Sequence, residues 1–199
     1  MIVLDIGANN GNSYYHLTND KSNVVYAFEP TPYLLEKFLY PKEKDNFIVI
    51  PNAVSDIEGE MEFKIAGNLD WGCSSLLDFS DDLNHTWPGR IDFKVTDKIK
   101  VNTIRMDSFI KKYNISSIDI MHCDTQGNDI KVLRSFGEYI NIIKSGQVEG
   151  FAQNPLYKDS ENSVDNLIVF LKNHQFNIDK LESNDVYQNE INIHFSKRK

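Results

Sequence analysis

The sequence predicts one α/β domain with a mostly parallel central sheet and helices on both of its faces. Short apolar runs alternate with helical patterns and turn signals, which is typical of βαβ units. The first run, residues 2–6, is rich in β-branched residues and leads into a turn with two glycines, as a buried parallel strand does. The 199 residues are 41% hydrophobic and 25% charged, which suits a single core of ordinary size.

The first part of the chain reads as three strands joined by two helices. Strands are expected at residues 2–6, 24–28 and 47–50, each a short apolar run. A short helix should begin at residues 13–17, and an apolar stripe predicts a second helix at residues 34–39.

The alternation of apolar runs and helical patterns changes after residue 52. Residues 60–65 alternate between charged and apolar side chains, which predicts a half-exposed antiparallel strand. Residues 67–90 are rich in Gly, Ser, Asp and Asn but include Trp71 and Trp87. Because connections this long are usually functional lids or disordered, we expect a loop that covers the substrate.

The remaining chain returns to alternating strands and helices and shows no sign of a second domain. The expected strands are residues 101–106, 118–123, 147–151 and 191–196, and the expected helices are residues 108–113, 127–136 and 167–174. Asp107 or Ser108 can cap the first of these helices. The last strand alternates polar and apolar residues and is expected to run antiparallel to the others, giving a sheet of about seven strands.

An acid or amide stands at the end of five of the expected strands: Asp5, Glu29, Asn52, Asp124 and Glu149. Ligands of open α/β sheets bind beyond the carboxyl ends of the strands, where strand order reverses. These five side chains are therefore the candidate site.

The first turn and Glu29 together predict a nucleoside-type ligand. Gly7, Asn9 and Gly11 can take the left-handed conformations that a tight turn needs, and Glu29 lies where a carboxylate can accept both ribose hydroxyls. Asp5 just before the turn favours a cationic ligand over a pyrophosphate. The alternatives are a tight turn with a solvated Glu29, and an Asp5 that only accepts hydrogen bonds from turn amides.

Six blocks, in this order and spacing, resemble the FkbM family of S-adenosylmethionine-dependent methyltransferases nearly end to end. They are VLDIGANNG at 3–11, VYAFEP at 25–30, NAVSD at 52–56 with Gly59, CSSL at 73–76, IDIMHCDTQGND at 118–129 and NPLY at 154–157. The resemblance implies a Rossmann-like class I methyltransferase fold and methylation of hydroxyl groups, often on sugars or polyketide-like products.

The resemblance also implies that the cofactor is S-adenosylmethionine. The methionine part would contact the first turn, and the ribose would bind Glu29. The adenine would lie against the segment after the third strand. The full set of expected cofactor residues is Asp5, Gly7, Ala8, Asn9, Gly11, Glu29, Pro30, Asn52, Ala53, Val54, Asp124 and Thr125.

Methyl transfer to a hydroxyl needs an in-line approach and a base, for which the candidates are His122, Asp124 and Glu149. We favour Asp124 near the reacting centre, with His122 either a base or a buried structural histidine. The family usually has Lys where this chain has His122 and Glu where it has Asp129. Asp124, Asp129 and Glu149 could hold Mg²⁺, but this is not favoured, and no metal site is predicted.

The acceptor side is expected to involve Trp71, Ser74, Ser75, Gln126 and Tyr157, with Trp87 from the same long loop as Trp71. Aromatic faces suit sugar rings and hydroxyls read their edges, although ordinary packing beneath a long loop explains these residues equally well.

The formal net charge of −8 argues against nucleic acid as a partner, leaving a small-molecule or carbohydrate methyl acceptor. Two unpaired cysteines and the lack of a long apolar run predict a cytoplasmic protein without membrane contact, and a homodimer is possible.

Three other functions compete with a hydroxyl methyltransferase. A non-catalytic S-adenosylmethionine-binding module would fit the departures at His122 and Asp129. An NAD-dependent oxidoreductase is weakened by Asn9 in the first turn. An RNA ribose methyltransferase would require a Lys/Asp/Lys/Glu set and a basic groove.

Overall fold

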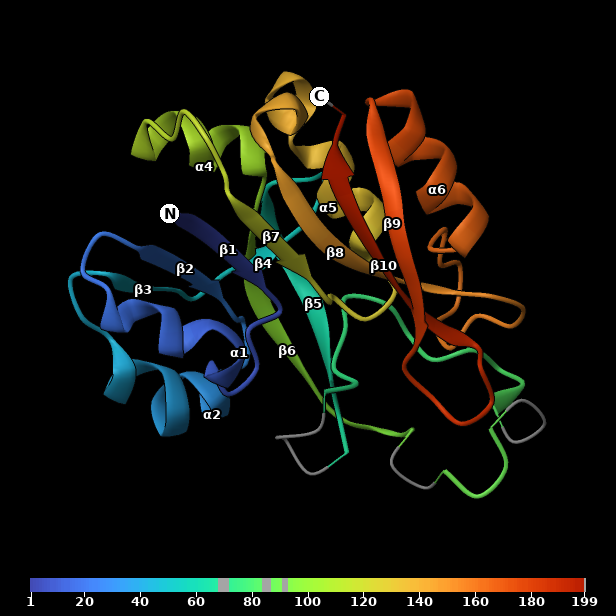
Figure 1. Cartoon of the computed structure of the whole chain (residues 1–199). Helices are drawn as coiled ribbons and strands as arrows, with labels where there is room; N and C mark the ends of the chain where they lie inside the picture. The colour runs from blue at the N-terminus through green and yellow to red at the C-terminus, as the bar shows by residue number, and fades with distance from the viewer. Residues whose placement is uncertain (68–71, 84–86, 91–92, 199) are drawn as a thin grey trace.

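The computed structural model describes residues 1–67, 72–83, 87–90 and 93–198. At its centre lies a seven-stranded sheet with the order β3-β2-β1-β7-β8-β10-β9 (Figure 1). The strands are β1 (Ile2–Ile6), β2 (Val24–Phe28), β3 (Phe47–Ile50), β7 (Ile120–Cys123), β8 (Ser145–Phe151), β9 (Phe176–Ser183) and β10 (Glu190–Lys197). All neighbours pair in parallel except β10, which is antiparallel to both β8 and β9. The predicted fold class is confirmed, and β9 is the strand that the sequence pattern missed.

Helices cover both faces of this sheet. One face carries α1 (Asn12–Tyr15) with the 3₁₀ turn His16–Asn19, and α2 (Pro32–Leu34), which continues as a π turn over Leu35–Leu39 and a 3₁₀ turn over Tyr40–Lys42. The other face carries α4 (Met106–Tyr113), α5 (Asp129–Ser135), the 3₁₀ segment Gly137–Ile142, and α6 (Val164–Asn173). Side chains alternate along β1, so that Leu4 and Ile6 pack into the larger core while Val3 packs against Leu35 and Leu39.

The structure corrects two details of the helix predictions. The helix expected at 108–113 begins at Met106, and its N-cap is Arg105, which makes no side-chain capping bond, so neither Asp107 nor Ser108 caps it. Ser163 does cap α6, because its hydroxyl accepts from the Asn166 N–H at 3.2 Å.

A second, smaller sheet lies beside the carboxyl ends of the main strands. It consists of β4 (Ala53–Val54), β6 (Val95–Ile104) and β5 (Gly59–Ala66), in that order, and appears below the main sheet in Figure 1. The antiparallel strand expected at 60–65 is confirmed in β5, which pairs with β6. The run at 101–106 was expected to return to the main sheet, but it ends at Ile104 and belongs to the small one.

The segment expected to cover the substrate is described in part, and Trp71 lies outside the described residues. Trp87 is 1% exposed and packs with Phe93, Leu156 and Tyr157 in a separate apolar cluster. Trp87 therefore serves as core material, which is the packing alternative that the sequence left open. Among the helices described, none has the length and apolar character needed to cross a membrane.

Candidate functional site

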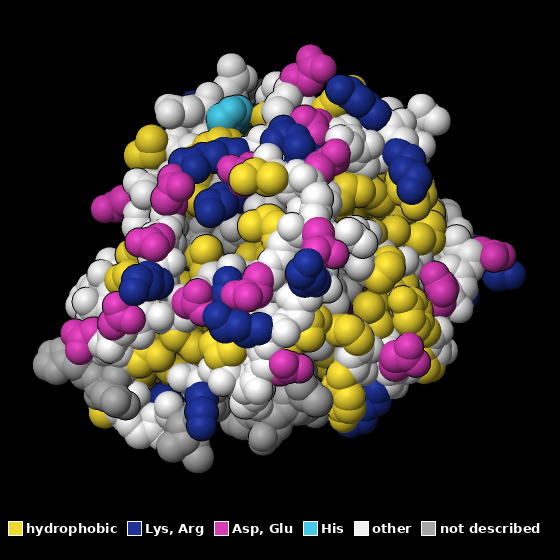
Figure 2. Space-filling model, turned by 180° about the vertical axis from the view of Figure 1, so that it is seen from behind, with side chains coloured by type: hydrophobic (Ala, Val, Ile, Leu, Met, Phe, Trp, Pro, Cys, Tyr) yellow, Lys and Arg dark blue, Asp and Glu magenta, His cyan; other side chains and the backbone are white. Residues whose placement is uncertain are grey.

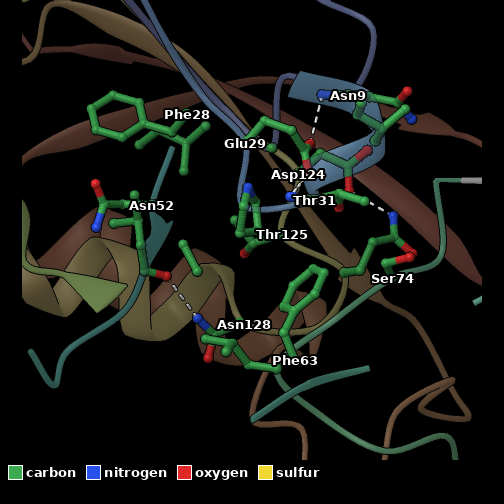
Figure 3. A pocket seen from close by; sticks show the side chains of 18 of the residues that line it. Asn9, Phe28, Glu29, Thr31, Asn52, Phe63, Ser74, Asp124, Thr125 and Asn128 are labelled. Carbon is green, nitrogen blue, oxygen red and sulfur yellow. Dashed lines mark hydrogen bonds between the residues drawn. The ribbon is translucent and has the colours of Figure 1, made fainter. Parts of the chain in front are cut away.

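A pocket with about 640 Å³ of empty space, part of it open to solvent, lies between the main sheet and the small sheet (Figure 3). It is formed at the carboxyl ends of β1, β2 and β7, and strand order reverses between β1 and β7. Its size is within the range of small-molecule and cofactor sites. The expected residues that line it are Gly7, Asn9, Glu29, Pro30, Asn52, Ala53, Val54, Ser74, Asp124, Thr125 and Gln126.

Three residues expected to bind the cofactor lie behind the pocket wall. Ala8 is 4% exposed and packs in the core under α2. Gly11 (φ +70°) faces the side chain of Leu39, where an added Cβ would come within 2.5 Å of Leu39 Cδ2. Asp5 is fully buried and does not line the pocket. Within this one turn, some residues therefore line the pocket and others pack into the core.

Gly7 has a conformational and a steric reason to be glycine. Its φ is +83°, and an ideal Cβ at this position would lie 1.9 Å from the backbone oxygen of Asp124. The ends of β1 and β7 therefore approach so closely that no side chain fits between them. The turn amides are also occupied, since the N–H groups of Gly7 and Ala8 both donate to Phe28 O.

Glu29 places a carboxylate in the pocket wall, held by two backbone amides. Its Oε2 accepts from the Asn9 N–H at 3.0 Å and its Oε1 from the Thr31 N–H at 2.9 Å. Burial raises the pKa of Glu29 to about 7, although the hydrogen bonds from Thr31 and Asn9 oppose this shift. Each oxygen keeps a lone pair for a further donor, so the carboxylate can accept ligand hydroxyls.

The opposite part of the pocket is less charged. Phe28 and Phe63 face it from β2 and β5, and the amides of Asn52 and Asn128 lie nearby (Figure 3). The Asn128 amide is fixed by donating to Val54 O at 3.1 Å. Aromatic rings and amides together suit a planar heterocycle.

The buried Asp5 and the half-buried His122 form a pair beneath the site. They are register neighbours on β1 and β7, and His122 Nδ1 lies 2.8 Å from Asp5 Oδ1. Burial alone would lower the pKa of His122, but the hydrogen bond and charge of Asp5, with the nearby Asp124, raise it above its ordinary value. Asp5 Oδ2 is buried and has no hydrogen-bond partner among the described residues. His122 does not line the pocket.

Asp124 and Gln126 form the boundary between this pocket and a smaller one. The half-buried Asp124 accepts at Oδ1 from Gln126 Nε2 at 2.6 Å, and the same Nε2 lies 3.4 Å from Glu149 Oε2. Burial raises the pKa of Asp124, against the charge of His122 and the hydrogen bond from Gln126. Asp124 and Glu149 were both in the predicted set of strand-end polar groups, and Gln126, predicted on the acceptor side, lies between them.

The smaller pocket has about 310 Å³ of empty space, and Glu149 and Tyr157 line it. Glu149 Oε1 accepts from Asn184 Nδ2 at 2.7 Å, and burial with the charges of Asp124 and Glu190 holds the pKa of Glu149 well above its usual range. The Tyr157 hydroxyl lies 2.6 Å from Gln126 Oε1. Glu149 and Tyr157 thus lie across Gln126 from the larger pocket.

Two further predicted residues have structural hydrogen bonds. Ser75 is 1% exposed, and its hydroxyl donates to Gln126 O at 2.7 Å. Asp129 is fully buried and accepts from the Thr125 and Glu149 N–H groups, at 2.9 and 2.8 Å. Throughout the described part of the chain, no group of three or more His, Cys, Asp or Glu side chains is arranged to hold a metal ion.

Several lining residues were absent from the predicted set. They are Ile6, Phe28, Thr31, Leu34, Phe63, Gly72, Leu76 and Asn128. Asn128 lies in the same block as Asp124, and Phe63 lies on the alternating strand, so both had a local signal. Only the position of the small sheet shows that Phe63 and Leu76 reach the cofactor side of the main sheet.

Solved structures that share this fold include an S-adenosylmethionine-dependent methyltransferase and proteins bound to this cofactor or its product. TrmK from M. capricolum, solved with S-adenosylhomocysteine, is 16% identical with a TM-score of 0.52, covering 100% of this chain and 63% of that one. Fibrillarin from Aeropyrum pernix, with natively bound S-adenosylmethionine, is 11% identical with a TM-score of 0.51, covering 97% and 65%. A putative S-adenosylmethionine-dependent methyltransferase from Listeria monocytogenes is 10% identical with a TM-score of 0.51, covering 100% and 91%. At these identities the likeness establishes the class I methyltransferase fold.

The family follows from the sequence itself. The FkbM methyltransferase domain matches residues 5–178, and the chain belongs to this family. It is an S-adenosylmethionine-dependent methyltransferase, as the six blocks predicted. Transcription elongation factor SPT5 from Candida glabrata is 34% identical over 94 residues, 47% of this chain but only 9% of that protein.

The expectation about partners is corrected by these comparisons. Nucleic acid was excluded because of the net charge, but the structures that share the fold include fibrillarin and the RNA methyltransferase TrmK. Figure 2 shows Lys and Arg side chains interspersed with Asp and Glu on one face of the molecule. A net charge of −8 is an average over such mixed surfaces and does not exclude a class of partner.

Proposed function

We propose that this methyltransferase transfers the methyl group to a hydroxyl oxygen of a small molecule or sugar, with Asp124 as the general base. The observation that carries the proposal is the position of the Asp124 carboxylate, which lines the larger pocket and is linked through Gln126 to Glu149 in the smaller one. A base between a cofactor pocket and an acceptor pocket is what proton removal during methyl transfer needs.

The side chains that line the larger pocket suit S-adenosylmethionine. Glu29 would accept the ribose hydroxyls, and Phe28 and Phe63 would flank the adenine with Asn52 nearby. Asp5 lies behind the pocket wall with Oδ2 buried and unpartnered, and its negative charge would favour a cationic sulfonium and amino group in the pocket. When bound, S-adenosylmethionine supplies an electrophilic methyl group on its sulfonium.

In the proposed reaction the acceptor oxygen forms a bond to the methyl carbon as the sulfur–carbon bond breaks, and the hydroxyl proton passes to Asp124. The raised pKa of Asp124 brings this carboxylate closer to the range in which a base is effective near neutral pH. The amides, carboxylates and aromatic residues of the smaller pocket suit a sugar or similar polyol. Gly72, Ser74 and Leu76 line the larger pocket, which supports a covering role for the described residues 72–76 of the long loop.

The test is methyl transfer from labelled S-adenosylmethionine to three sets of acceptors: glycans, small alcohols and RNA. We expect label on a glycan or small alcohol, retained after alkaline hydrolysis of esters. Label on RNA instead would overturn the acceptor class. Cofactor binding without transfer to any set would favour the non-catalytic binding module.

Ionisation of Glu29 should make cofactor affinity depend on pH. In the free protein its raised pKa means that its contribution to stability is present below about pH 4.5 and is lost as the pH rises through about 7. Ribose hydroxyls donate to the ionised form, so the affinity for S-adenosylmethionine should rise about tenfold from pH 6 to pH 8. Isothermal titration calorimetry across this range measures the effect.

Glu29→Gln should remove this pH dependence and weaken binding by about tenfold or more, because it puts an amide N–H against a backbone N–H and removes the charge. The exposed Glu36→Gln is the matched control and should bind as the wild type does. A wild-type affinity that is flat between pH 6 and pH 8 would contradict the assignment of Glu29 to the ribose.

A further inference from the structure

The turn after Asp124 holds Gln126 in an unusual backbone conformation. Gln126 has φ +54° and Gly127 has φ +88°, both in the left-handed region. Ser75 Oγ donates to Gln126 O at 2.7 Å, and the ring of Tyr157 packs so closely that a Cβ on Gly127 would lie 2.8 Å from it. Contacts from two distant segments thus fix this turn.

The side chain of Gln126 has only one amide orientation that satisfies its neighbours. Nε2 donates to Asp124 Oδ1 at 2.6 Å and lies 3.4 Å from Glu149 Oε2, while Oε1 accepts from the Tyr157 hydroxyl at 2.6 Å. The reversed amide would put an oxygen against two carboxylates. Tyr157 favours the observed orientation because its hydroxyl can donate to an amide oxygen. The same hydroxyl also lies 2.8 Å from Cys73 O, so its one proton can be donated to either acceptor.

We propose that Gln126 is a positioning residue, oriented by Tyr157, that holds the Asp124 carboxylate ionised and aimed at the acceptor. This inference rests on the proposed role of Asp124 as the base. The hydrogen bond from Gln126 engages Oδ1, so Oδ2 is the oxygen that receives the acceptor proton. A donor to the ionised form also opposes the burial that favours the neutral acid.

Other charged groups around Asp124 act on the same carboxylate and must be held constant. Asp5 favours its neutral form and His122 its ionised form, while Asp129, Glu149 and Glu190 are acids whose own titration depends on Asp124. Substitutions at Gln126 and Tyr157 leave all five in place. Gln126→Met also removes the long contact of Nε2 with Glu149 Oε2 at 3.4 Å, whereas Tyr157→Phe keeps the Gln126 amide, so a shift in both variants assigns the effect to the hydrogen bond on Asp124.

The test is a pH titration of Asp124 in the full chain. ¹³C NMR of labelled aspartate carboxyls monitors its ionisation, and the Asp124→Asn variant assigns its signal. Gln126→Met should move the Asp124 midpoint to higher pH, and Tyr157→Phe should move it in the same direction by less. Transfer to any acceptor found active should fall about tenfold or more in kcat for Gln126→Met, with the affinity for S-adenosylmethionine retained.

Tyr26→Phe is the matched control, because Tyr26 is a buried tyrosine packed on Phe109 away from both pockets. Its Asp124 titration and transfer rate should equal those of the wild type. An Asp124 midpoint that is unchanged in both Gln126→Met and Tyr157→Phe overturns the positioning role while leaving the proposed function intact. A wild type that transfers no methyl group overturns the proposed function, whereas the titration still decides whether Gln126 acts on Asp124.

Discussion

Gly7→Ala is expected to lower the free energy of unfolding by about 3 kcal/mol or more, and in the extreme to prevent folding. The added Cβ would lie 1.9 Å from the backbone oxygen of Asp124, and backbone on both sides cannot move aside as a flexible side chain can. The left-handed φ of +83° adds its own strain. Urea unfolding monitored by circular dichroism measures the loss.

Gly89→Ala separates the steric cause from the conformational one. Gly89 has φ +82°, nearly the same as Gly7, but an added Cβ there would meet nothing within 4 Å. It should cost only about 1–2 kcal/mol, the ordinary cost of a left-handed alanine. Equal losses in the two variants would show that the close approach of β1 and β7 is not the reason for glycine at position 7.

The main sheet could be predicted because its strands carry their own signals. The runs at 2–6, 24–28 and 47–50 are apolar except for Asp5, and they form β1, β2 and β3 with those bounds. β9 was missed because five of its eight residues are polar or charged and its outer face is exposed. The small sheet was missed for another reason, since sequence alternation shows a strand but not which sheet it joins.

The sequence could predict those site residues whose positions depend only on the strand that they follow. Glu29 and Asp124 both follow the ends of parallel strands, and both line the pocket. Asp5 instead lies one residue before the end of β1, where it pairs with His122 across the register and stays behind the wall. Strand alternation would place His122 and Asp124 on one face if the strand reached Asp124, but β7 ends at Cys123, and only Asp124 lines the pocket. Alternation also could not show that Asp5 on the adjacent strand would lie within hydrogen-bond distance of His122 Nδ1.

Asp124→Asn is expected to reduce kcat for methyl transfer by about 10²- to 10⁴-fold, the usual contribution of a positioned base. Asparagine keeps the shape of the side chain and an oxygen that can accept from Gln126 Nε2, but it cannot take up the hydroxyl proton. Affinity for S-adenosylmethionine should change by less than about tenfold, because Glu29 and the aromatic walls remain. Single-turnover transfer with saturating cofactor separates the chemical step from binding.

His122→Asn is the informative comparison, because an asparagine Nδ2 can replace His122 Nδ1 as the donor to Asp5 while removing the titrating ring. If Asp124 is the base, His122→Asn should keep the plateau value of kcat within about tenfold of the wild type and move the acidic limb of the pH profile to higher pH, because the charge of His122 favours ionised Asp124. The reverse outcome, with transfer lost in His122→Asn and retained in Asp124→Asn, would assign the proton to the histidine. The Asp5–His122 pair would then be part of the proton path, whereas the absence of both residues from the pocket lining favours a role in holding β1 and β7 together.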